Sequence, residues 1–177
     1  MVERYPFLEP IFDRINWHNF SFLHFVKAVE EFRGRAIRLW PIPIPAPLQF
    51  GLWLAGRETD YIFFESNTAG VHQNHIISHE IGHILLGHRT LEVTDATPDT
   101  VQALLTSLTD TDDPDRPAPL MRDLLGMRSP TREEAAEELA TLIQRELIRR
   151  AGLQAMTADP ARAPLWQEYA LGLGLSD

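Results

Sequence analysis

The sequence predicts an α+β fold, in which a small, mainly antiparallel sheet packs on a histidine-rich helix and further helices lie on the N- and C-terminal sides. Two observations predict it: a pair of short apolar segments separated by a polar tripeptide, and helical periodicity before and after that pair. With 177 residues, the chain is long enough for one domain with a real core. We therefore expect a single domain over 1–177, with its core at about 20–151.

The first predicted helix follows Ser21, a favourable N-cap residue, and ends at Gly34. Its apolar residues recur at helical spacing and are Phe22, Phe25, Val26, Val29 and Phe32. The segment AIRLW (36–40) is typical of a strand. Prolines at 41, 43, 45 and 47 then remove every second backbone donor, which predicts an extended, edge-like connector.

The segments FGLWLAG (50–56) and DYIFFES (60–66) flank the tripeptide RET and predict a β-hairpin. The next segment, HQNHIISHEIGHILLGH (72–88), predicts one helix that continues to Gly87. The residues that form its buried side are Ile77, Ile81, Ile84 and Leu85.

The last part of the chain predicts further helices. VQALLTSL (101–108) is helical in pattern, and the acidic TDTDDPDRPAP (109–119) is typical of a loop. A long helix follows Pro130, with Thr131 and Glu134 as a capping box and Gly152 as its end. We expect a helical tail over 152–177, with one more helix near 163–173.

Composition and charge limit the function. Hydrophobic residues make up 44% and charged residues 23%, as in an ordinary folded protein. The net charge of -9 argues against direct nucleic-acid binding, because clustered Lys and Arg supply sequence-independent affinity. The N-terminus lacks the apolar stretch of a secretory signal, and no run approaches the roughly 20 apolar residues of a membrane span. We therefore expect a cytoplasmic protein without membrane contacts.

The histidine-rich helix carries the pattern HEIGH, an HExxH motif. Residues advance by about 100° on a helix, so His79 and His83 lie on one side, one turn apart, and can bind one metal ion. Glu80 lies on the flank of this pair, where it can reach a water molecule on the ion but not the ion itself. Gly82 lies on the metal-facing side and, having no side chain, leaves room for metal or substrate.

The other histidines of this segment fit an ion less well. His75 shares the face of the pair but is about 12 Å along the axis from His83, and His72 is farther still. We expect polar, cleft-lining or surface roles for both. His88 falls roughly opposite His79 on the wheel, so we expect it to cap the helix as an imidazolium, favoured by the C-terminal dipole.

Because the chain has no cysteine, any zinc must be held by His, Asp or Glu. Glu92 and Asp95 follow the helix too closely to fold back easily. Glu133 and Glu137 are one turn apart on the helix after Pro130, so one could bind zinc while the other hydrogen-bonds a ligand histidine. The neighbouring acidic residues that we expect to be solvated are Glu134 and Glu138.

A helix, the hairpin, HEIGH and a later helix with EEAAEELA (133–140) together resemble the ImmA/IrrE family of bacterial zinc metallopeptidases, over about residues 20–145. The family pattern Glu-x-x-Ala-(Asn or Asp)-x-Phe-Ala, matched by position, implies Glu133 as the third zinc ligand and Glu137 as the contact of a ligand histidine. Here Glu137 replaces the usual Asp or Asn, and Leu139 replaces the aromatic residue. The long separation of the motifs indicates an insertion at 92–130.

The resemblance implies a Zn²⁺-dependent endopeptidase of the gluzincin-like HExxH type, with Glu80 as the general base. It also implies a protein substrate, a helix-turn-helix repressor. Two other functions fit the same motifs: a catalytically silent zinc module that binds a regulator, and a component of a toxin system. Candidate donors to the oxyanion are Tyr61, His72 and His75, and the hairpin edge could hold the substrate as an added strand.

Overall fold

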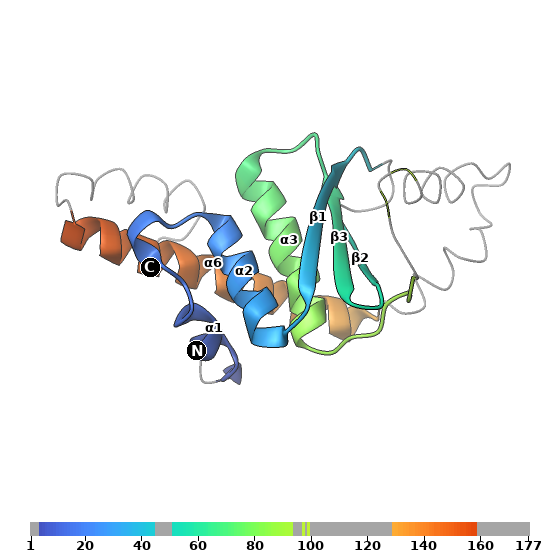
Figure 1. The fold of residues 1–177 in the computed structure, drawn as a ribbon, viewed down its shortest axis with the longest axis horizontal. Coiled ribbons are helices and arrows are strands. Elements are labelled where there is room, and N and C mark those ends of the chain that lie inside the picture. Colours follow the sequence, from blue (N-terminus) through green and yellow to red (C-terminus); the bar gives the residue numbers. More distant parts are fainter. Residues whose placement is uncertain (1–3, 45–50, 94–96, 98, 100–128, 159–177) are drawn as a thin grey trace, which may run out of the picture. The chain divides into compact units, whose positions relative to one another are not determined.

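The computed structural model describes residues 4–44, 51–93, 97, 99 and 129–158. Their elements, in chain order, are α1 (Leu8–Phe12), the 3-10 helix η2 (Trp17–Asn19), α2 (Phe22–Arg33), β1 (Ala36–Ile42), β2 (Gly51–Ala55), β3 (Thr59–Glu65), α3 (Gly70–Leu85) and α6 (Pro130–Ala158) (Figure 1). The predicted α+β class is confirmed. The predicted elements at 101–108, 109–119 and 163–173 lie outside the described residues, as does nearly all of the expected insertion at 92–130.

The chain divides into two compact units. One unit comprises Met1–Gly34 and Thr141–Asp177, and the other comprises Arg35–Ala140. The sheet, α3 and the first residues of α6 therefore belong to the second unit, whereas α1, α2 and the remainder of α6 belong to the first. The prediction of a single domain stays a prediction.

The sheet has three strands in the order β1-β3-β2. The predicted hairpin is confirmed, because β2 and β3 are antiparallel, with Gly51 opposite Phe64 and Ala55 opposite Asp60. β1 pairs with the other side of β3 and runs parallel to it, so the sheet is mixed where the sequence predicts a mainly antiparallel one. Pro41 is accommodated because β1 is an edge strand, which can lack a backbone donor on its outer side.

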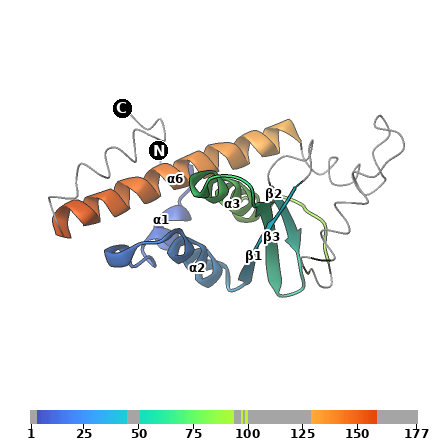
Figure 2. The same cartoon turned by 90° about the horizontal axis from the view of Figure 1, so that it is seen from above.

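Helix α3 packs against β2 and β3 and lies beside the sheet in both views of the fold (Figure 1, Figure 2). The apolar residues buried in these three elements include Leu52, Leu54, Ile62, Phe63, Ile77, Ile81 and Ile84. Leu85 is only half-buried, because the helix ends there rather than at Gly87. Burying apolar side chains contributes about 1.5–3 kcal/mol for each large residue, so these residues stabilise the sheet and its helix.

In the first unit, α1 packs against α2. The rings of Phe12 and Phe25, both fully buried, lie with their centroids 6.4 Å apart. The predicted helix ends are confirmed: the backbone N–H of Ser21 donates to His24 Nδ1 at 3.1 Å, and Gly34 adopts φ 66° and closes the last turn. Only glycine adopts that left-handed conformation without strain.

Helix α6 differs from its prediction at both ends. It begins with Pro130 as its first residue, and the carbonyl of Ser129 accepts hydrogen bonds from the N–H groups of Arg132 and Glu133. Thr131 therefore lies inside the helix, and the predicted capping box of Thr131 and Glu134 is wrong. Gly152 does not end the helix, which continues to Ala158. A glycine in right-handed helical conformation costs about 1 kcal/mol relative to alanine, which is too little to stop a long helix.

Within the first unit, α6 is tied to α1 by a polar contact. Arg150 donates two hydrogen bonds to the Glu9 carboxylate, at 2.7 and 2.8 Å, and its guanidinium lies 4.7 Å from the centre of the Phe12 ring. Both bonds come from Nη2 of Arg150, which therefore lies between the two carboxylate oxygens. Among the described residues, no helix has the length and apolarity that a membrane crossing requires.

Glu146 supplies a pH-dependent contribution to stability. Its buried carboxylate accepts hydrogen bonds from Arg149 at 2.6 and 3.0 Å and from Arg150 at 3.4 Å. Burial raises the pKa of Glu146, but the hydrogen bonds and charges of Arg149 and Arg150 outweigh it and leave the pKa below its usual value. Stability gained in this way is present above the unfolded-state pKa of about 4.3 and is lost as the pH falls through the lower folded-state pKa.

We predict that Glu146→Gln lowers the free energy of unfolding at neutral pH by about 1–2 kcal/mol, because the arginines lose a charged acceptor. The difference from wild type should shrink between about pH 5 and about pH 3, as the wild-type carboxylate takes up its proton. Urea unfolding followed by circular dichroism measures it, with the exposed Glu134→Gln as control. A difference that stays constant over this range contradicts the prediction.

Candidate metal centre

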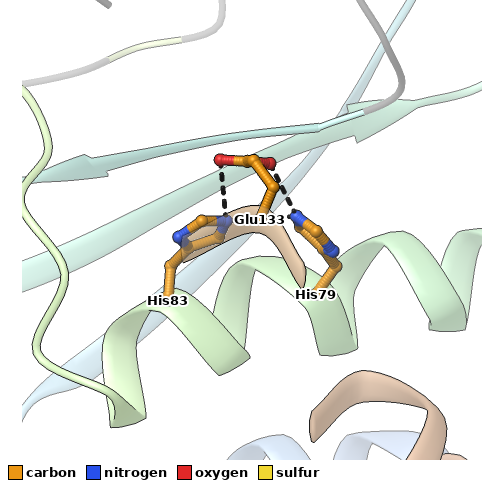
Figure 3. A group of neighbouring side chains, drawn as sticks. All are labelled: His79, His83 and Glu133. Atoms are coloured by element: carbon orange, nitrogen blue, oxygen red, sulfur yellow. Dashed lines mark hydrogen bonds and ion pairs between the residues drawn. The ribbon is translucent and has the colours of Figure 1, made fainter. Parts of the chain in front are cut away.

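The two histidines of HEIGH lie on one side of α3, as their spacing predicts. His79 Nε2 and His83 Nε2 are 3.1 Å apart, and both rings are directed toward the Glu133 carboxylate of α6 (Figure 3). Glu133 Oε2 lies 3.3 Å from His79 Nε2, and Glu133 Oε1 lies 3.5 Å from His83 Nε2. The structure therefore brings together three residues that are up to 54 positions apart in the chain.

The spacing of these three groups suits a single small cation. One ligand atom from each of His79, His83 and Glu133 lies within 4.8 Å of the others, so the group could hold a metal ion. A tetrahedral ion with bonds of about 2.0–2.1 Å requires ligand atoms about 3.3–3.4 Å apart. The two imidazole nitrogens are 3.1 Å apart, and each lies at a comparable distance from an oxygen of Glu133: His79 Nε2 is 3.3 Å from Oε2, and His83 Nε2 is 3.5 Å from the other oxygen, Oε1. The donor set of two imidazoles and a carboxylate therefore fits a divalent ion, which His79, His83 and Glu133 would hold.

Gly82 explains how α6 reaches the histidines. A Cβ atom at Gly82 would lie 3.0 Å from the carbonyl oxygen of Ala136 and 3.3 Å from its Cα atom. The backbones of the two helices therefore touch here, and Glu133 lies about one turn before Ala136. The sequence predicts that the empty side of Gly82 leaves room for metal or substrate. That interpretation is wrong, because the backbone of α6 fills this space.

The outer nitrogen of His79 also has a partner on α6. Glu137 Oε2 lies 3.1 Å from His79 Nδ1, and Glu137 Oε1 lies 2.9 Å from His75 Nε2. The contact that the sequence predicts for Glu137 is thus present, although its effect on a metal stays a prediction. The contact of His75 is not part of that prediction. Residues 75 and 79 are one turn apart, so a carboxylate facing one ring reaches the other as well.

His88 lies where the sequence does not predict it. The helix ends at Leu85, and Gly87 at φ 65° turns the chain back, so that the His88 N–H donates to the His83 carbonyl at 3.0 Å. His88 Nδ1 then lies 2.8 Å from His83 Nδ1. Burial and the charge of Arg132 lower the pKa of His88, so its surroundings do not favour the predicted imidazolium cap. The glycine at 87, favourable for the end of a helix, is the signal that could have placed His88.

Glu80 is buried on the flank of the histidine pair, between α3 and the sheet. Only 3% of its surface is exposed. A Cβ atom at Gly51 would lie 2.8 Å from Glu80 Oε1 and 2.7 Å from Ile76 Cγ2. Strand β2 therefore passes directly over this carboxylate, and a residue larger than glycine at position 51 would displace it.

The outer edge of β2 is partly used by the chain itself. The N–H of Ala55 donates to the Leu91 carbonyl at 3.0 Å, and the Val93 N–H donates to the Ala55 carbonyl at 2.9 Å. The Thr90 hydroxyl donates to the carbonyl of Trp53. A substrate strand cannot pair at Trp53 and Ala55 while these bonds hold. This restricts the predicted addition of a substrate strand to the hairpin edge.

The other candidate residues lie apart from the group of three. Glu92 is exposed and lies beside Ala55 at the edge of the sheet, and Asp95 lies outside the described residues. Tyr61 packs against Gly56 in the hairpin turn. The acidic residues predicted to be solvated are indeed exposed: Glu134 and Glu138.

The three side chains of the group differ in their exposure to solvent. The exposed fraction of the side chain is 9% for His83, 17% for His79 and 30% for Glu133. The histidine nearer the end of α3 is therefore enclosed most, and Glu133 Oε1, which faces it, is itself buried although other atoms of the Glu133 side chain are exposed.

Comparison of the chain with protein-family models, curated proteins and solved structures finds no match. The resemblance to the ImmA/IrrE family therefore rests on the sequence motifs and stays a prediction.

We predict that Glu133→Ala weakens the binding of Zn²⁺ by more than about 100-fold, because it removes one of three ligands and changes to outer partners alone cost 10–100-fold. The matched control is Glu134→Ala, which removes an exposed carboxylate from the next position. Competition with a chromophoric chelator measures both affinities. Equal affinities of the two variants would direct the search for the third ligand to Glu137, Glu92 or Asp95.

Gly82→Ala and Gly70→Ala form a second matched pair on α3. A Cβ atom at Gly70 meets nothing within 4 Å, so that substitution should keep or raise stability. At Gly82 the new methyl group presses on the backbone of Ala136. We predict a free energy of unfolding about 1–2 kcal/mol below that of Gly70→Ala, together with weaker Zn²⁺ binding. Thermal unfolding and chelator competition test this. Equal stabilities and equal Zn²⁺ affinities of the two variants would contradict the prediction, because they would show that α6 accommodates the new methyl group without loss.

Proposed function

We propose that this chain is a zinc-dependent metalloendopeptidase of the HExxH type, which hydrolyses a peptide bond in a protein substrate. The observation that carries the proposal is the group of His79, His83 and Glu133 around one small volume, with Glu80 next to His79 in the chain. Two imidazoles and a glutamate are the ligand set of several zinc peptidases, which keep a fourth position open. Nitrogen and oxygen donors at these separations also suit zinc in a chain without cysteine.

His79, His83 and Glu133 would hold the ion. When bound, zinc lowers the pKa of a water ligand and polarises a carbonyl group. Glu137 accepts the Nδ1–H of His79, which leaves Nε2 of that ring free of a proton and able to bind a cation. The same carboxylate is oriented by His75, so its geometry does not depend on a single contact.

Glu80 is the general base in this proposal. Its carboxylate accepts a proton from the attacking water and passes it to the nitrogen of the leaving amine, while the water oxygen bonds to the carbonyl carbon and the C–N bond breaks. The enclosure of Glu80 beneath Gly51 supports this role, because a carboxylate held between a helix and a strand has few other orientations. Such positioning reduces the entropy lost in reaching the transition state.

The resemblance to the ImmA/IrrE family supports a protein as the substrate, and within that class a helix-turn-helix repressor. The acidic balance of the chain agrees with an affinity for a basic, DNA-binding protein rather than for DNA. Trp53 and Ala55 of β2 are already hydrogen-bonded to residues 90–93. An extended substrate segment would therefore have to approach the centre without pairing to these two residues.

We predict that Glu80→Gln keeps one zinc ion per chain and loses proteolysis by about 10²–10⁴-fold, since the amide cannot accept the proton. The zinc-loaded wild type, Glu80→Gln and the exposed control Glu134→Gln are each incubated with a helix-turn-helix regulator encoded beside the gene. Fragments are followed by mass spectrometry, and metal content is measured in parallel.

Undiminished cleavage by Glu80→Gln would exclude Glu80 as the base. A stable complex of the wild type with the regulator, formed without fragments, would instead identify a zinc-bearing module that binds its partner. Absence of zinc from the wild type would overturn the whole proposal.

A further inference from the structure

We propose that His88 is a positioning residue for the metal ligand His83. It acts by accepting a hydrogen bond from the outer nitrogen of that ring. The inference rests on the proposed metal centre and adds to it a residue that the HExxH motif and the Glu133 helix do not include. Its evidence is the separation of 2.8 Å between His83 Nδ1 and His88 Nδ1.

The proton positions follow from the geometry. His83 Nε2 faces the site, 3.1 Å from His79 Nε2 and 3.5 Å from Glu133 Oε1, so it must be without a proton to bind a cation. A neutral ring then carries its proton on Nδ1. His88 Nδ1 lies within reach of that proton and accepts it when His88 carries its own proton on Nε2. This arrangement fixes both the tautomer and the rotation of the His83 ring.

The backbone holds His88 in the required place. Gly87 adopts φ 65°, and the His88 N–H donates to the His83 carbonyl at 3.0 Å, so the acceptor is anchored to the residue it orients. The two rings lie 4.9 Å apart, with an angle of 64° between their planes. A tilted pair of this kind lets an in-plane N–H of one ring point at a nitrogen of the other.

The two histidine ligands thus have separate supports. The outer nitrogen of His79 contacts the Glu137 carboxylate on α6, whereas that of His83 contacts an imidazole from the turn after α3. Because a metal-bound histidine almost always donates its second N–H to a partner, His83 requires one, and His88 meets this requirement. His83 is also the more enclosed ligand, with 9% of its side chain exposed, so water has less access to replace that partner.

The test separates hydrogen bonding from packing by two substitutions. His88→Phe keeps a flat ring but removes the acceptor, whereas His88→Asn keeps an acceptor oxygen near the Nδ1 position but removes the ring. We expect His88→Phe to weaken Zn²⁺ binding about 10–100-fold and His88→Asn to stay within a few-fold of wild type. Affinities come from chelator competition with the full chain, and His18→Phe controls for the loss of an exposed histidine.

The opposite order, with Phe tolerated and Asn impaired, would show that the ring only packs and would overturn the proposal. Equal affinities of wild type, Phe and Asn would overturn it as well. If His88→Phe fails to fold, judged by circular dichroism in the presence of chelator, then His88→Asn decides: wild-type affinity supports the inference, and a loss above tenfold overturns it.

The failure of the proposed function gives a different result. If the wild type does not bind one Zn²⁺ per chain, the proposed metal centre is wrong, and so is the role of His88 in it. If the wild type binds Zn²⁺ and all His88 variants bind it with the same affinity, only the proposed role of His88 is wrong. The visible spectrum of the Co²⁺-loaded proteins is a second readout, because a rotated His83 ring changes the ligand field even where affinity changes little.

Discussion

The contact between the backbones of α3 and α6 at Gly82 and Ala136 is the constraint on which the candidate centre depends. Helices packed through ordinary side chains have axes about 8–10 Å apart, and small residues at the crossing allow a closer approach. Here a Cβ atom at Gly82 would already be 3.0 Å from the opposing carbonyl oxygen. This proximity lets the Glu133 side chain, about one turn away on α6, reach both His79 and His83.

Around this crossing, the polar side chains form one connected set. Glu137 joins His75 to His79, Glu133 faces His79 and His83, and His88 supports His83. Carboxylates beside imidazole nitrogens create a region that favours a cation, and each contact limits the rotation of its neighbour. The ligand atoms are therefore held near the distances that a small ion requires, so less ordering is needed when the ion binds.

Several features could be read from the sequence because they depend on neighbours along the chain. Helical spacing places His79 and His83 together, and the RET tripeptide between apolar segments indicates the hairpin. Other features cannot be read in this way, because a glycine can either end a helix or lie within it. Gly87 has a positive φ and follows the end of α3, whereas Gly152 lies inside α6. The parallel pairing of β1 with β3 has no local signal, since the two strands are separated by residues 43–58 and meet only in the folded sheet.

The sequence by itself determined the part of the centre that lies within one helix, namely the histidine pair and the glutamate on its flank. Their relation follows from a fixed rotation and rise per residue, whatever surrounds them. The family pattern implies Glu133 as their partner, and the tertiary structure brings it to the pair. Tertiary structure alone decided that Gly82 makes room for a helix rather than a ligand, and that His88 turns back onto His83. These relations depend on how closely two backbones approach and where a chain reverses, which local periodicity does not contain.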